Sequence, residues 1–599
     1  DKKRSFIDSA NSFPENTEIL HTLTFNANKA PSSNQTKSFS FQINHSIIAL
    51  PKDLMKIRYE DERVGWFTIE KINYSSEALK SEKFSLIRRW KLVPSDLDAY
   101  SRGELVEPVK PIVYYLDPAT PLKWRKYFKM GIEDWNSSFE KAGFKNAIIA
   151  KDPPTKEEDP DFSAEDIRYS TVRYVASETR NAVGPSVSDP RTGEILESDI
   201  IWYHNHLRSY RNRYLIETGA ANPKARSLDT PEEEIGEMMR RVISHEIGHA
   251  LGLPHNMKAS SAYAVDSLRS GKFTQKFGIA TSIMDYARYN YVAQPGDQNI
   301  RFVRQLGPYD DYSIEWGYRY FGESPETEMK TLKTMVDSKS IDPIYMFGGY
   351  GNDPNSQTEN IGNDPVRASF YGIKNLKIVA KNLMNWTLKP SDNYDDLNEI
   401  YSELVSVYRR YIYHVHNLVG GVYKTLHNSN QKGITTYFNV DVSNQKEALV
   451  FLEQNLWNTQ KWLMSKNLVS QIKEEGVLSS IQDLQISALN KFLNVKKLNT
   501  LMSTQTSLKG NGMTVKELVD NLFKVLIVKR AKPDLFEQRL QLHFAEKINS
   551  LMKEKELNST IKGILLDSKN DLHSLSKRRL IFSKREKKVH FSYLKKLSE

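Results

Sequence analysis

A helix with clear start and stop signals, ending in a cluster of histidines, is the feature that most constrains the fold. Thr230 is a residue type that caps helices, Pro231 is favoured at the first helical position, and Glu233 follows three residues after the cap. Gly252 is the residue type that commonly ends a helix in a left-handed conformation. This punctuation predicts a helix over about residues 231–251.

The end of this helix carries the pattern of a catalytic metal site. His245 and His249 are four residues apart, so they share one helical face and can bind one ion together. Pro254 cannot continue a helix, so the chain turns there and returns His255 as a third ligand. Three imidazoles leave a fourth position open for water, and Glu246 stands next to it as a candidate general base. All five positions of HExxHxxGxxH together are far more specific than HExxH alone.

The residue types available narrow the metal chemistry. The chain has no cysteine, which excludes disulfides, thiolate ligands and a cysteine-based inhibitory switch. Histidine and carboxylate remain, and we expect one catalytic Zn²⁺. The Asp- and Asn-rich segment 351–364 offers the oxygen ligands that calcium prefers, but it lacks EF-hand spacing. Calcium is therefore possible but unsupported, and a loop is the favoured interpretation.

The motif resembles that of the metzincin clan, in which HExxHxxGxxH is followed by a turn containing methionine. In this sequence the turn is Ser282-Ile-Met-Asp-Tyr286. The resemblance implies that Met284 forms a hydrophobic floor under the metal without binding it. It also implies that Tyr286 is an additional zinc ligand that swings away to stabilise the tetrahedral intermediate. The alternative for Tyr286 is an ordinary core tyrosine near the site.

Further stretches, beyond the motif, are similar to a bacterial family of large secreted zinc-dependent metalloproteases with uncharacterised flanking domains. They include residues 181–194, 265–269, 282–288 and 291–297. Asn256 follows the third histidine where named metzincin subfamilies carry Glu, Asp, Ser or Pro, so the chain is not a plain member of those groups. The resemblance also implies that an edge strand containing Gly184, Pro185 and Ser186 pairs with an extended peptide substrate.

The patterns on either side of the motif predict a multidomain α+β chain. At 599 residues the chain exceeds the size at which one core keeps growing. Residues 1–109 alternate apolar and polar positions, which predicts an N-terminal antiparallel β domain. For residues 110–320 the resemblance implies a metzincin-like zinc metallopeptidase domain with a mixed five-stranded sheet, the active-site helix and the Met-turn. Residues 321–599 have helical periodicity and predict an α-helical C-terminal region.

Charge and hydropathy bear on partners and location. The net charge is +10, but residues 569–599 alone hold ten Lys or Arg against three acidic residues. This basic tail either contacts an anionic surface or is a solvated helix face, and the second interpretation is favoured because charge runs are usually solvated. We expect a protein or peptide substrate, no nucleic acid and no transmembrane segment. Because the chain begins at Asp1, we expect an N-terminal segment to have been removed, and the family resemblance implies a secreted, periplasmic or outer-surface protein.

These observations predict a zinc-dependent endopeptidase. Peptide bonds would be hydrolysed by a metal-activated water, with Glu246 as general base. Two alternatives stay open: a catalytically inactive metzincin-fold binding or scaffold protein, and a zinc hydrolase that acts on non-peptide amides.

Overall fold

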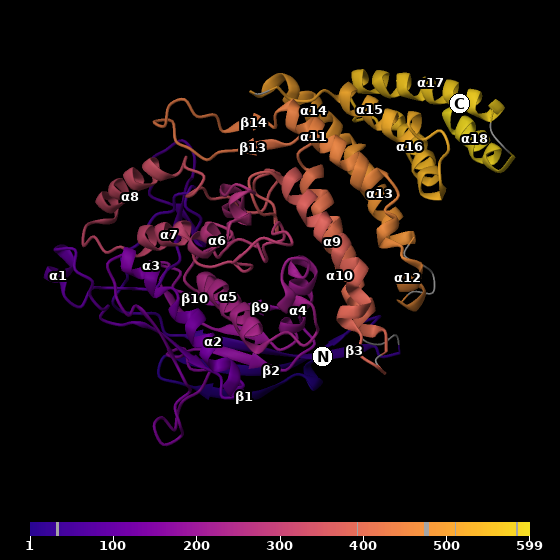
Figure 1. Ribbon diagram of the computed structural model, residues 1–599. Helices are drawn as coiled ribbons and strands as arrows, with labels where there is room; N and C mark the ends of the chain where they lie inside the picture. The colour runs from indigo at the N-terminus through magenta and orange to yellow at the C-terminus, as the bar shows by residue number, and fades with distance from the viewer. Residues whose placement is uncertain (32–34, 392, 473–477, 510, 583–584) are drawn as a thin grey trace. The chain divides into compact units, whose positions relative to one another are not determined.

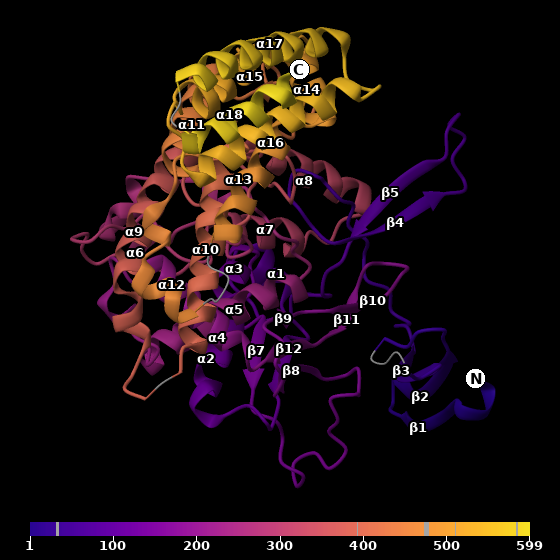
Figure 2. The ribbon, with the colours of Figure 1, turned by 90° about the vertical axis from the view of Figure 1, so that its right-hand side faces the viewer.

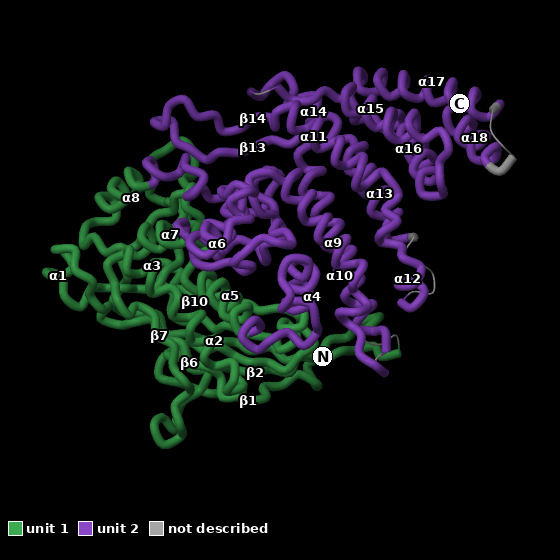
Figure 3. Tube along the Cα trace, in the orientation of Figure 1, with its two compact units in different colours: residues 1–208, 236–254, 310–335 green, residues 209–235, 255–309, 336–599 purple. Residues whose placement is uncertain are grey.

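The computed structural model describes residues 1–31, 35–391, 393–472, 478–509, 511–582 and 585–599 (Figure 1). Contacts divide the chain into two compact units (Figure 3). Unit 1 comprises residues 1–208, 236–254 and 310–335, and unit 2 comprises residues 209–235, 255–309 and 336–599. Each unit consists of three separate stretches of the chain, so the units do not correspond to consecutive domains. The division into three domains at residues 109 and 320 therefore stays a prediction.

The N-terminal part of unit 1 is antiparallel β structure, as the period-two pattern predicts. Strands β1 (Phe6–Ser12), β2 (Asn16–Asn26) and β3 (Ser38–Ile48) form a three-stranded antiparallel sheet in chain order. Strands β4 (Thr68–Asn73) and β5 (Glu82–Ile87) form a separate hairpin, which can be followed in Figure 2.

A mixed five-stranded sheet follows, in the order β7-β6-β8-β12-β9. Strands β6 (Ile112–Leu116), β7 (Ile148–Lys151), β8 (Ser170–Val175) and β12 (Ile200–Tyr203) are parallel, and β9 (Ala182–Val183) is the antiparallel edge strand. Parallel neighbours need a crossover, which α2 (Leu122–Glu133) and α3 (Asn136–Lys141) provide between β6 and β7. Strands β10 (Ser186–Ser188) and β11 (Ile195–Ser198) form a hairpin beside this sheet. The predicted fold class is therefore confirmed for both β regions.

The long helix predicted from its end signals is α5 (Glu232–Ala250). It approaches α2 closely because glycines lie at the points of contact. A Cβ on Gly131 would lie 2.6 Å from the carbonyl oxygen of Arg240, and one on Gly236 would lie 2.1 Å from the ring of Tyr127. A residue with a side chain at either position would clash, so the two helices can pack this closely only because both residues are glycine.

Unit 2 is mainly helical, which confirms the prediction for the C-terminal region. Its helices include α6 (Gly271–Phe277), α9 (Pro365–Thr387), α10 (Asp395–His416), α11 (Val442–Leu452), α13 (Leu478–Phe492), α14 (Val495–Ser507), α15 (Val515–Phe523), α16 (Leu535–Lys553), α17 (Ser559–Phe582) and α18 (Arg585–Ser598). One continuous apolar cluster runs through them. A short hairpin, β13 (Val422–Lys424) with β14 (Tyr437–Asn439), interrupts the helices.

The structure defines both the Asp- and Asn-rich segment 351–364 and the basic tail. In segment 351–364, Asp353 pairs with Lys258 (2.9 Å) and Asp364 caps the start of α9 through the amide of Arg367 (3.0 Å). The basic tail forms the end of α17 and all of α18, although Lys584 lies outside the described residues. Within the described part of the chain, no helix combines the length and the apolar character that a bilayer span requires.

Candidate metal centre

Three histidines meet at the end of α5. His245 is buried, His249 and His255 are half-buried, and the candidate ligand nitrogens all lie within 4.8 Å of one another. His245 and His249 lie one turn apart on the helix, with ring centroids 4.8 Å apart. Across the residues that the structure describes, no other group of three or more histidine or acidic side chains converges in this way. The donor set fits a single cation held by imidazoles.

The backbone orients His249 for this role. Its Nδ1 lies 2.7 Å from the carbonyl oxygen of Leu253, and a carbonyl can only accept, so Nδ1 carries the proton. The lone pair of the neutral ring is therefore on Nε2, the nitrogen that remains for a metal. Gly252, at φ +107°, bends the chain after the helix so that Leu253 can accept this bond. The predicted left-handed stop at Gly252 is confirmed.

Groups from the N-terminal β region, and one tyrosine from a later helix, hold the end of α5. The indole of Trp90 donates to the carbonyl oxygen of Ala250 (2.9 Å), and the amide of Phe67 donates to that of Gly252 (2.8 Å). The hydroxyl of Tyr318, in α7 (Pro308–Tyr318), donates to the carbonyl of Leu251 (2.7 Å). The last carbonyls of a helix have no partners within it, so these bonds satisfy groups that would otherwise need water.

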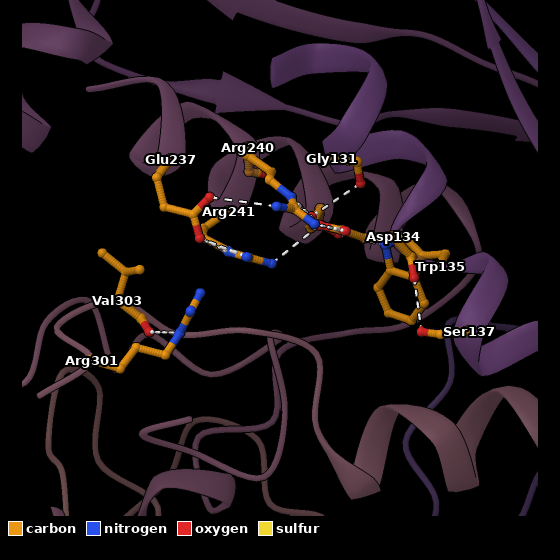
Figure 4. A network of polar contacts seen from close by, with 10 residues as sticks. Gly131, Asp134, Trp135, Ser137, Glu237, Arg240, Arg241, Arg301 and Val303 are labelled. Atoms are coloured by element: carbon orange, nitrogen blue, oxygen red, sulfur yellow. Dashed lines mark hydrogen bonds and ion pairs between the residues drawn. The ribbon is translucent and has the colours of Figure 1, made fainter. Parts of the chain in front are cut away.

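A polar cluster fixes α5 just before the first histidine (Figure 4). Asp134, at the end of α2, accepts from Arg240 Nε (2.9 Å) and Arg241 Nη1 (3.1 Å), and its Oδ2 lies 3.0 Å from the hydroxyl of Ser244. The indole of Trp135 donates to the carbonyl oxygen of Ser244 (2.8 Å). Ser244 directly precedes His245, so these contacts hold the helix where the metal ligands begin.

Glu246 lies beside the chain segment predicted to bind substrate. Its side chain is buried, and a Cβ on Gly184 would lie 2.8 Å from the backbone oxygen of Glu246. Gly184 and Pro185 directly follow the edge strand β9, whereas Ser186 begins β10. Arg88 donates to the backbone oxygen (2.8 Å) and hydroxyl (2.6 Å) of Ser186. The role of this segment toward a substrate stays a prediction.

Asn256 directly follows the third histidine and differs from the residue types that the named subfamilies have at this position. It forms hydrogen bonds to two other segments of the chain. It is fully buried, and its amide donates to the carbonyl oxygen of Met284 (3.2 Å). Its side chain donates to the carbonyl of Met346 (3.0 Å) and accepts from the amide of Gly348 (3.0 Å). The side chain of Asn256 therefore acts both as a donor and as an acceptor, which an ionised Glu or Asp or a Pro at this position could not do.

The turn at residues 282–286 lies against His255. Met284 is fully buried, and its amide donates to the hydroxyl of Ser282 (2.9 Å). The ring centroid of Tyr286 lies 4.4 Å from that of His255. A second tyrosine, Tyr350, lies 5.5 Å from His255, and sequence reasoning did not identify it because no motif marks it.

A cluster of charged side chains lies next to Tyr286. The guanidinium of Arg288 lies 5.3 Å from the centre of the Tyr286 ring, and its Nε donates to Glu359 (2.8 Å). Burial alone would raise the pKa of Glu359, but Arg213, Arg288 and Arg410 lower it to about 2. Glu359 therefore stays ionised and holds three cations in place.

The comparisons with known proteins agree with this site. Residues 227–533, just over half of the chain, match the family model described as Met-zincin. The chain belongs to the Met-zincin family. Residues 1–95 match a second model, described as a domain of unknown function (DUF5117). No curated protein and no solved structure gave a match. Family membership and the three-histidine cluster together imply zinc binding, and they confirm the metzincin resemblance of the sequence.

Proposed function

We propose that this Met-zincin is a zinc-dependent endopeptidase with His245, His249 and His255 as metal ligands. The convergence of three imidazole nitrogens within 4.8 Å carries the proposal. It is supported by the tautomer of His249, whose Nδ1 bond to Leu253 leaves Nε2 for the metal. Zinc in such a site supplies a Lewis acid that polarises a carbonyl and makes a water molecule more acidic.

The chain's own groups then handle the protons and the developing charge. Glu246, one residue along the helix from His245, would take a proton from the attacking water and deliver it to the leaving amine. The hydroxyl of Tyr286 would donate to the oxyanion, and Met284 would form the apolar floor as in a Met-turn. Residues Gly184, Pro185 and Ser186 would receive an extended peptide alongside the edge strand. Export from a bacterial cell belongs to the same proposal.

The test compares the zinc-loaded chain with its Glu246→Gln variant on an unbiased peptide library. Loss of the general base should lower kcat/KM by about 100-fold or more while zinc stoichiometry stays unchanged. Glu233→Gln is the matched control, because Glu233 is an exposed residue in the first turn of the same helix. Removal of zinc with a chelator should abolish cleavage, and added zinc should restore it.

Other outcomes would favour the alternatives. Stoichiometric zinc without cleavage of any peptide would favour a binding or scaffold protein. Hydrolysis of non-peptide amides alone, identified by mass spectrometry of the products, would favour a different zinc hydrolase.

A further inference from the structure

A cavity of about 390 Å³ lies within unit 2 between α10 and the segment that begins at Tyr350. Its size is within the range of small-molecule and side-chain binding pockets. The lining residues come from residues 350–358 and from the last three turns of α10 with the residue after it: Tyr350, Gly351, Ser356, Gln357, Thr358, Ser406, Arg409, Arg410, Tyr413, His414 and Asn417.

Tyr350 connects this cavity with the proposed active site. It lines the cavity, and its ring lies 5.5 Å from His255 and 6.5 Å from Tyr286. Because Tyr350 both lines the cavity and lies next to His255, a peptide bound at His255 would lie near the cavity.

The walls of the cavity are held in place by hydrogen bonds. The side-chain amide of Gln357 donates to the carbonyl oxygen of His414 (3.1 Å), and Asn417 donates to Gln357 Oε1 (2.7 Å). His414 Nε2 donates to the carbonyl of Thr358 (2.9 Å). A site built in this way is formed before a ligand arrives, which lowers the entropic cost of binding.

The cavity has a positive lining. Arg409 and Arg410 are the only charged residues among those that line it, and no carboxylate is among them. Burial lowers the pKa of the lining residue His414 to about 4, so its ring is neutral. Arg410 pairs with Glu359 (2.5 Å), but Glu359 is shared with Arg213 and Arg288. Arg409 is exposed, and no ion pair to it is found in the described part of the chain. The positive charge is thus only partly balanced.

We propose that this cavity is a substrate subsite that binds a carboxylate, with Arg409 as the residue that recognises it. The inference rests on the proposed function, because the cavity would serve the same active site. A planar guanidinium matches a carboxylate with two parallel hydrogen bonds, and Arg409 is available to make them because no carboxylate of the cavity lining competes for it. The carboxylate would belong to an Asp or Glu side chain of the peptide or to its free C-terminus.

The test uses alanine-based peptides in which one position at a time is Glu, Gln or Lys, each with a free or an amidated C-terminus. We expect one position at which Glu raises kcat/KM about tenfold over Gln, as a charge-assisted hydrogen bond would. Arg409→Glu should reverse this preference toward Lys, whereas Arg578→Glu, at an exposed site in α17, should leave it unchanged. An effect of the free C-terminus in place of the Glu effect would assign the cavity to the terminal carboxylate.

The proposal is overturned if cleavage shows no preference for a carboxylate, or if the preference survives in Arg409→Glu. If the wild-type chain cleaves no peptide, the proposed function fails and the subsite is judged by binding alone. Fluorescein-labelled Glu and Gln peptides are then titrated with zinc-loaded protein. Tighter binding of the Glu peptide that is lost in Arg409→Glu supports the subsite, and equal binding of both peptides overturns it. Zinc content and thermal unfolding of each variant show that it is folded.

Discussion

Asp134→Asn is the substitution that tests how the metal-binding helix is held. Asp134 accepts bonds from Arg240 and Arg241 and lies 3.0 Å from the hydroxyl of Ser244, and only 12% of its side chain is exposed. The asparagine keeps the shape but removes the charge, and its amide nitrogen would face donors. Because Ser244 precedes His245, loosening this cluster should loosen the helix where the ligands begin.

The expected cost follows from burial. Removing one partner of a buried ion pair costs about 3–5 kcal/mol. Arg240 is 23% exposed, and both arginines keep contacts with Glu237, so part of this loss is offset. We therefore expect a local loss of about 2–4 kcal/mol. Such a loss would speed the amide hydrogen exchange of α5 by about 30- to 900-fold.

Hydrogen exchange followed by mass spectrometry measures this loss locally, which suits a chain of more than one unit. Ser244→Ala, which removes a neutral hydroxyl from the cluster, should have a smaller effect of about 1 kcal/mol. Asp53→Asn makes the same chemical change at a 93% exposed residue paired with Lys91, and should cost less than about 1 kcal/mol. Unchanged exchange in α5 of Asp134→Asn would refute the reasoning, as would equal effects of all three variants.

Two further predictions concern the helix end and the stability of unit 2. Gly252→Ala would place a Cβ 2.1 Å from the carbonyl oxygen of Arg88, so zinc stoichiometry should fall, whereas Gly103→Ala, also at positive φ but in open space, should bind zinc normally. Burial lowers the pKa of His416 to about 3, so only the unfolded chain gains a proton between pH 6.5 and 3, and stability falls as the pH falls through that window. His416→Gln should reduce the loss of unfolding free energy between pH 7.5 and 5 by about 2 kcal/mol, and an unchanged pH dependence would contradict this.

The sequence predicts those parts of the site that depend on local chain geometry. The i, i+4 spacing of His245 and His249 and the left-handed stop at Gly252 are properties of a single helix and its end, and the structure contains both. The alternating pattern likewise predicted the N-terminal strands, because it reports which face of a strand is buried.

The contacts that support the site are not predictable in this way, because they join residues far apart in sequence. Asp134 lies 110 residues from Ser244, and Trp90 lies 160 residues from Ala250. Helix α2 ends at Glu133 and α3 begins at Asn136, and the side chains of Asp134 and Trp135 between them both bond to α5. Sequence periodicity cannot predict such residues, because their roles depend on hydrogen-bond partners in another element.

The regions on both sides of the metal motif belong to the structure of the site. In unit 1, Phe67 and Trp90 of the N-terminal β region hold the last carbonyls of α5. In unit 2, Met346 and Gly348 hold Asn256, the neighbour of the third histidine. Each of these bonds involves a buried or half-buried backbone group, and leaving such a group without a partner costs up to about 1–3 kcal/mol. The family match beyond residue 320 therefore has a physical basis: the helical region supplies part of the support for His255, and residues 110–320 alone would lack it.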